Sequence, residues 1–292
     1  MESDEQRRSH SFLCTDCSST GGSFRAGRGE DGERFLNYIT SLKLEIPDVR
    51  NLRILLYGPQ GAGKSSFFNS VDTVLRGRIS TRALGNSGAG RSFTIKSKTY
   101  KLRNPTLPFT FTDITGIHEG GTGIQPGDIM KLLKGHISDG YTFNPASTIT
   151  EEDPRYKRNP ELKDKIHCLV AVLPANTLSS IPDKVFRQMS EVRNKARDLD
   201  IPQVIIMTKV DETCELAEKD LRKVYTSKKI KQKMVECSNK LGVPVECIFP
   251  VKNYHEERAT NTTADTLLLD ALQHIVNFAK DHVEDQADEK DD

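Results

Sequence analysis

Hydrophobic residues along the chain gather into short continuous runs that alternate with segments of helical periodicity. Four runs have the length and apolar character of strands: 51–57, 166–173, 203–207 and 247–251. Apolar residues elsewhere recur every three or four positions, as in 185–199 and 264–279, and predict helices with one buried face. Strands that alternate with helices predict an α/β fold, a three-layer sandwich with a mostly parallel sheet that binds its ligand at the carboxyl ends of the strands.

The remaining patterns add an edge to this sheet and further helices. Residues 97–102 alternate between apolar and polar as an edge strand does, and 108–114 is predicted to pair with them as an antiparallel hairpin. We expect helices or helix pairs at 32–47, 126–136 and 215–240. The segment 140–159, which is rich in proline, asparagine and charge, is expected to be an insertion.

The first strand leads directly into a complete phosphate-binding motif. Residues 58–65, Gly-Pro-Gln-Gly-Ala-Gly-Lys-Ser, fill every fixed position of G-x-x-x-x-G-K-[ST], and a predicted helix follows. The glycines let backbone N–H groups turn toward an anion. The Lys64 ammonium would reach the β- and γ-phosphates, and the Ser65 hydroxyl would bind Mg²⁺. The residues predicted to contact the nucleotide here are Gly58, Gln60, Gly61, Ala62, Gly63, Lys64, Ser65 and Ser66.

A second nucleotide motif, D-x-x-G, ends the strand at 108–114. Asp113 would hold Mg²⁺ through water, and the Gly116 N–H group would meet a γ-phosphate. The motif alone is common. Its place at the end of a strand, about fifty residues after the phosphate loop, makes the prediction specific.

A third motif, Thr-Lys-Val-Asp at 208–211, follows a buried strand and predicts which base is bound. A carboxylate at Asp211 would accept both the N1–H and the N2–H groups of guanine. Adenine offers no such pair of donors and would leave this carboxylate unpaired, which is costly. The stem of Lys209 would stack along the base, and Thr208 would tie this loop to the phosphate loop.

Three further residues, Val251, Lys252 and Asn253, stand where a fifth guanine-contacting loop is expected. The three motifs together predict a P-loop NTPase of the Ras-like G-domain class, with GTP or GDP and Mg²⁺ as cofactors. An ATPase would leave Asp211 without a role in base recognition, so this interpretation ranks last.

Composition limits the compartment and the partners. The 292 residues carry 42 basic and 41 acidic side chains, a net charge of +1, so we expect no nucleic-acid partner. No apolar run approaches the roughly 20 residues of a transmembrane segment, and the N-terminus lacks a signal-peptide core. The six scattered cysteines are typical of reduced cytosolic thiols, and Cys14 and Cys17 are expected to be ordinary thiols rather than zinc ligands. These features predict a cytoplasmic protein.

The two ends of the chain differ in composition from its centre. Residues 1–30 and 285–292 carry few large apolar side chains, so burial cannot offset the entropy of ordering them. We therefore expect a disordered leader over 1–30, a G domain over 31–284 and a disordered acidic tail over 285–292.

Several stretches besides the nucleotide motifs resemble one family. They are Gly58–Asn69, Tyr141–Pro145, Leu162–Cys168, Lys209–Asp211 and Val251–Tyr254. Over roughly residues 33–285 the chain resembles the GTP-binding domain of the interferon-induced protein 44 family. Some members carry an N-terminal TLDc domain, where this chain has a short leader. The resemblance implies a cytoplasmic protein of vertebrate innate immunity that is induced by interferon and linked to antiviral defence.

The residues that would control hydrolysis depart from the pattern of Ras-like GTPases. Many of these enzymes place a water-orienting glutamine directly after the D-x-x-G glycine, where this chain has Ile117. His118 could orient water instead, and Arg91 could act as an arginine finger, although an ordinary surface role is the simpler interpretation of both. The resemblance supports Thr94 as the switch-loop threonine that closes on Mg²⁺.

Two functions are therefore compatible with the sequence. The first is a slow GTPase switch whose loops at 85–96 and 116–125 order on the γ-phosphate and present a surface to an unidentified protein partner or a second copy of the chain. The second is a nucleotide-binding scaffold that does not hydrolyse GTP.

Overall fold

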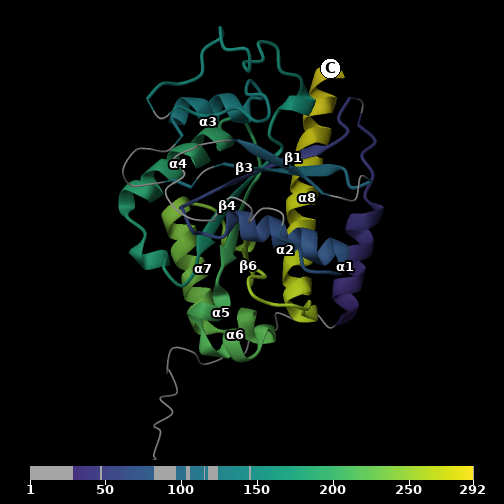
Figure 1. The fold of residues 1–292 in the computed structure, drawn as a ribbon, viewed down its shortest axis with the longest axis vertical. Coiled ribbons are helices and arrows are strands. Elements are labelled where there is room, and N and C mark those ends of the chain that lie inside the picture. Colours follow the sequence, from purple (N-terminus) through teal and green to yellow (C-terminus); the bar gives the residue numbers. More distant parts are fainter. Residues whose placement is uncertain are drawn as a thin grey trace, which may run out of the picture.

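A six-stranded sheet lies at the centre of the protein (Figure 1). The computed structural model describes residues 29–46, 48–81, 97–102, 106–114, 116–117, 124–144 and 146–291. Its strands are β1 (Leu52–Tyr57), β2 (Lys98–Lys101), β3 (Phe109–Asp113), β4 (Cys168–Pro174), β5 (Gln203–Thr208) and β6 (Ile248–Pro250). They lie in the order β2-β3-β1-β4-β5-β6, and every neighbouring pair is parallel except β2 and β3. The prediction of a mostly parallel sheet with an antiparallel edge hairpin is confirmed.

Helices lie between and beside these strands, most of them where the sequence predicts a helix, whereas the short helix at 210–213 was not predicted. They are α1 (Gly29–Ser41), α2 (Lys64–Arg76), α3 (Pro126–Leu133), α4 (Asp183–Arg197), α5 (Val210–Thr213), α6 (Glu215–Lys219), α7 (Lys228–Leu241) and α8 (Thr262–Asp291). Short 3₁₀ turns lie at Leu162–Asp164, Leu178–Ser180, Leu221–Thr226 and Val245–Cys247.

The sheet separates two apolar cores. Successive side chains of β1 point to opposite faces, so Leu55 and Tyr57 belong to one core and Ile54 and Leu56 to the other. The first core contains side chains of α3, α4 and α7, and the second contains side chains of α1, α2 and α8. The helices lie on the two sides of the sheet accordingly (Figure 1). This arrangement is the predicted three-layer α/β sandwich.

The C-terminal end of α8 corrects one expectation. We expected a disordered acidic tail from residue 285, but the helix continues to Asp291. Ala279 and Val283 are fully buried, and Ala287 packs against the same core. Apolar residues thus continue at a spacing of four, which keeps one face of the acidic segment on the protein.

Other expectations fall partly or wholly outside the described residues. These include the leader up to residue 28 with Cys14 and Cys17, the whole loop at 85–96, and residues 118–123. Over the part of the chain that is described, no helix is long and apolar enough to cross a membrane.

Candidate functional site

The phosphate loop joins the end of β1 to the start of α2, next to the point where the strand order changes direction. β1 lies between β3 and β4, so a crevice opens at the carboxyl end of β1, where ligands bind in open α/β sheets. Gly63, which directly precedes α2, has a positive φ of 94° that favours glycine. This conformation lets the loop turn into the helix, whose first backbone N–H groups suit an anion.

Lys64 lies inside this loop. Its side chain is only 7% exposed, and its Nζ donates hydrogen bonds to the carbonyl oxygens of Gly58 (3.1 Å) and Pro59 (3.0 Å). Burial lowers the pKa of Lys64, and the carboxylate of Asp113 offsets this only in part. The ammonium is thus held within the loop by neutral carbonyl groups, which an anionic ligand can outcompete.

The two side chains predicted to bind Mg²⁺ in this region lie next to each other. The Ser65 hydroxyl at the start of α2 donates a hydrogen bond of 2.7 Å to Oδ2 of Asp113, the last residue of β3. No group of three or more His, Cys, Asp or Glu side chains among the described residues could hold a metal ion. A hydroxyl and one carboxylate nevertheless suit Mg²⁺, which takes few protein ligands and completes its shell with water and phosphate oxygens.

The D-x-x-G segment contacts the phosphate loop through its backbone. The N–H group of Ile117 donates to the carbonyl oxygen of Gly58 at 3.0 Å. A Cβ atom on Gly116 would lie 2.5 Å from the Cα atom of Gln60, so only glycine permits this approach. Ile117 is half-buried and packs against the core. The three residues that were proposed to assist hydrolysis lie outside the described residues: Arg91, Thr94 and His118.

The 208–211 motif contacts the phosphate loop as its expected role requires. The fully buried Thr208 hydroxyl donates a hydrogen bond of 2.7 Å to the carbonyl oxygen of Ala62. Lys209 has a left-handed backbone with φ of 58° and directly precedes α5. Asp211 therefore lies in the first turn of that helix.

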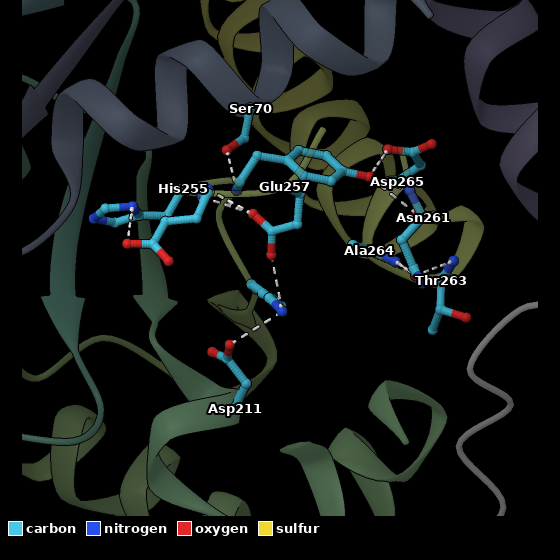
Figure 2. Close-up of polar contacts among 11 residues, drawn as sticks. Ser70, Asp211, His255, Glu257, Asn261, Thr263, Ala264 and Asp265 are labelled. Carbon is cyan, nitrogen blue, oxygen red and sulfur yellow. Dashed lines mark hydrogen bonds and ion pairs between the residues drawn. The ribbon is translucent and has the colours of Figure 1, made fainter. Parts of the chain in front are cut away.

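A cavity of about 500 Å³ joins these elements. Its lining residues come from the phosphate loop, the start of α5 and the loop after β6: Gly61, Gly63, Ser66, Lys209, Asp211, Glu212, Lys252, Asn253, Tyr254, His255, Glu256 and Glu257. The side chain of Asp211 is ion-paired with Lys252, whose Nζ lies 3.4 Å from its Oδ2 (Figure 2). Asp211 and the phosphate loop thus line the same cavity.

Two predicted contact residues have structural roles. Val251 is fully buried, packs in the core beside α8 and donates its N–H group to the carbonyl oxygen of Met207, so it does not line the cavity. A contact of Val251 with the nucleotide would therefore have to come from its backbone, and its assignment to the guanine-contacting loop stays a prediction. The side chain of Ala62 is also fully buried, and this residue contributes its carbonyl oxygen to Thr208.

Asn253 belongs to the expected guanine-contacting loop, whereas Glu257 was not predicted from the sequence. The Asn253 amide donates from Nδ2 to the carbonyl oxygen of Gly63 at 3.1 Å, and its Oδ1 atom is buried without a hydrogen-bond partner. Glu257 lies 3.0 Å from Lys252. Nothing in the spacing of Glu257 distinguishes it from the adjacent Glu256.

Curated proteins with similar sequences belong to one group. Interferon-induced protein 44-like of Homo sapiens is 32% identical over 242 residues, which cover 81% of this chain and 53% of that protein. Interferon-induced protein 44 is 34% identical in Homo sapiens (54% of that protein covered) and 32% identical in Mus musculus (57% covered). The chain therefore spans about half the length of the curated relatives it matches. A search of protein-family models finds no match.

Two similar solved structures have a lower sequence identity to this chain than the curated relatives have. A probable GTP-binding protein engB matches at 14% identity and a TM-score of 0.44, covering 78% of this chain and 98% of that one. Toc33 from Arabidopsis thaliana, in complex with GDP and Mg²⁺, matches at 14% identity and a TM-score of 0.45, covering 86% and 90%.

Proposed function

We propose that this chain, which over 81% of its length is a relative of interferon-induced protein 44 and 44-like, is a guanine-nucleotide-binding protein that acts as a slow GTPase switch. The observation that carries the proposal is the single cavity bordered by the phosphate loop and by Asp211. A purine nucleotide has a charged end and a base, and these two elements offer a partner for each. By the same relationship we propose an interferon-induced, cytoplasmic protein with a role in antiviral defence.

The phosphates would lie over the start of α2. The first backbone N–H groups of this helix suit such an anion, and Lys64 would exchange its bonds to the carbonyl oxygens of Gly58 and Pro59 for bonds to phosphate oxygens. Bonds to an anion are stronger than those to neutral carbonyl groups, so the exchange favours nucleotide binding.

Ser65 and Asp113 would hold Mg²⁺, the first directly and the second through water. The ion would neutralise negative charge on the phosphates. Binding it requires Ser65 to give up its hydrogen bond to Asp113, and both side chains are already directed to the same point between α2 and β3.

The base would lie against the start of α5. Asp211 would accept the N1–H and N2–H groups of guanine, and the aliphatic stem of Lys209 would cover one face of the ring. The hydrogen bond from Thr208 to Ala62 fixes the distance between the base-binding and phosphate-binding segments. This pairing pattern is the reason that we propose guanine rather than adenine.

Ile117 favours a second candidate, a scaffold that binds the nucleotide without hydrolysing it. Its apolar side chain packs against the core and offers no hydrogen bond to an attacking water. The intrinsic rate of Ras is on the order of 10⁻⁴ s⁻¹, and an arginine finger adds roughly 10³–10⁵. We expect the isolated chain to lie at or below the intrinsic Ras rate and to accelerate only when a partner or a second copy supplies a charge.

Single-turnover GTP hydrolysis at increasing protein concentration distinguishes the candidates. A slow rate that rises with concentration supports the switch and self-association. Tight GTP binding with no hydrolysis at any concentration supports the scaffold. A rate above about 1 s⁻¹ that is independent of concentration would mean a complete site within one chain. His118→Ala and Arg91→Ala, made separately, would then identify the group responsible.

A further inference from the structure

We propose that Glu257 is a positioning residue for base recognition: it draws the ammonium group of Lys252 toward itself and so limits the ion pair with Asp211, whose carboxylate the base needs. The inference rests on the proposed guanine site and assigns the carboxylate that keeps this site accessible. The ammonium group of Lys252 is ion-paired with both Asp211 and Glu257, and Figure 2 labels these two carboxylates.

The distances favour Glu257 as the main partner of the lysine. Nζ of Lys252 lies 3.0 Å from Oε1 of Glu257 and 3.4 Å from Oδ2 of Asp211. Burial alone would lower the pKa of Lys252, but the carboxylates of Glu257 and Asp211 outweigh it and raise that pKa. The lysine is therefore charged, and the two carboxylates compete for it.

Glu257 is itself fixed by the backbone. Its Oε2 accepts the N–H groups of His255 (2.7 Å) and Glu256 (3.2 Å), which leaves Oε1 for Lys252 (Figure 2). Although burial raises the pKa of Glu257, these hydrogen bonds and the ion pair hold it at about 2. The carboxylate therefore keeps its charge and its orientation throughout the physiological pH range.

The backbone on both sides of Lys252 is anchored independently of Glu257. The Val251 N–H group donates to the carbonyl oxygen of Met207 at 2.8 Å, Asn253 binds the carbonyl oxygen of Gly63, and the Tyr254 N–H group donates to Oγ of Ser70 at 2.9 Å. Loss of the Glu257 carboxylate would thus leave the main chain at 251–254 in place and free the lysine side chain.

Of the two carboxylates with which Lys252 is ion-paired, that of Asp211 would remain for a freed ammonium group. A closer ion pair there would occupy the oxygens that the N1–H and N2–H groups of a base need, since both kinds of donor form charge-assisted bonds to a carboxylate. Lys252 would then compete with guanine for Asp211. Glu257 prevents this competition, and it does so without touching the base.

The test measures the affinity for GDP and for ADP, in Mg²⁺ buffer, of the wild type and of variants. Glu257→Gln should weaken GDP binding about tenfold, the factor that ~1.4 kcal/mol represents, while the weaker affinity for ADP changes little. Glu256→Gln is the matched control, because that side chain borders the same cavity, is 91% exposed and does not contact Lys252. It removes the same charge and should leave GDP binding unchanged.

A double variant separates positioning from damage to the loop. Glu257→Gln combined with Lys252→Met removes the competing ammonium and should recover most of the lost GDP affinity. Unchanged GDP affinity in Glu257→Gln overturns the proposal, and so does a double variant that binds as weakly as Glu257→Gln alone. A wild type without preference for GDP over ADP overturns the guanine site as well, which distinguishes the two failures.

Discussion

The hydroxyl group of Thr208 donates a 2.7 Å hydrogen bond to the carbonyl oxygen of Ala62, a residue 146 positions earlier in the chain. Both residues are fully buried, one at the end of β5 and the other in the phosphate loop. The bond connects the segment proposed to bind the base with the segment proposed to bind the phosphates. The affinity for a nucleotide that contacts both segments would depend on the distance between them.

Thr208→Val should therefore weaken nucleotide binding as well as folding. Valine has the shape of threonine but leaves the Ala62 carbonyl without this donor, at a cost of about 1–3 kcal/mol in the free energy of unfolding. Thr208→Ser keeps the hydroxyl and should bind GDP nearly as the wild type does. Urea unfolding and GDP titration of both variants provide the check. Equal GDP affinity in Thr208→Val and wild type would show that the bond does not position the two segments.

Lys64→Ala should weaken GTP binding by at least about 2 kcal/mol, as expected for hydrogen bonds from a charged group. The variant leaves the charge on the β- and γ-phosphates uncompensated. Calorimetry in Mg²⁺ buffer measures the loss, and Lys184→Ala, on the exposed surface of α4, provides a lysine control. Wild-type affinity in Lys64→Ala would contradict the phosphate-binding role of the loop.

Asp211→Asn should change which base is preferred. The amide presents a donor where guanine needs a second acceptor, and xanthine carries an acceptor at that position. We expect the variant to favour xanthine nucleotides over GTP in competition for a labelled nucleotide. Asp198→Asn, on an exposed aspartate paired with Arg197, should leave the preference unchanged. If GTP competes equally well against wild type and Asp211→Asn, the assignment of guanine is wrong.

His167 should make folding sensitive to acid. Its Nδ1 accepts the N–H group of Arg53 and its Nε2 donates to the carbonyl oxygen of Leu162, both at 2.9 Å, so the buried ring must be neutral. Burial lowers the pKa of His167 from 6.5 to about 4. The folded state thus binds this proton less readily than the unfolded state.

The stability that depends on neutral His167 should be complete above pH 6.5 and lost as the pH falls toward 4. The loss should approach about 3 kcal/mol, since one pKa unit corresponds to 1.36 kcal/mol. Urea unfolding at several pH values measures it. His167→Asn can still accept the Arg53 N–H group, and it should be less stable at pH 7 but lose much less on acidification. If the free energy of unfolding of His167→Asn falls with pH as steeply as that of the wild type, other groups cause the acid sensitivity.

The sequence predicts the fold well where burial repeats with a clear period. The runs that became β4 and β5 have no polar interior residue, β1 is interrupted by Arg53 alone, and an apolar stripe marks α8. The same pattern predicted an end of α8 that is too early, because a single alanine, Ala287, continues the apolar stripe within an acidic segment. Small apolar residues spaced by four are weak signals among charged neighbours.

The candidate site was predictable where short motifs carry the chemistry and less so elsewhere. Ser65 and Asp113 are 48 positions apart and still form the expected pair. Glu257 belongs to no motif, since its effect depends on how the loop after β6 turns its backbone N–H groups toward one carboxylate. Val251 was assigned from its place next to Lys252, although a buried strand end directs its side chain into the core.

Direct binding of guanine and adenine nucleotides to the purified wild type tests the central claim. A labelled GDP analogue should bind in Mg²⁺ buffer and be displaced by unlabelled GDP and GTP, with ADP and ATP at least about a hundredfold weaker, because adenine cannot satisfy Asp211. Equal displacement by guanine and adenine nucleotides would contradict a guanine-specific site. Failure of any nucleotide to bind would contradict a nucleotide-binding function altogether.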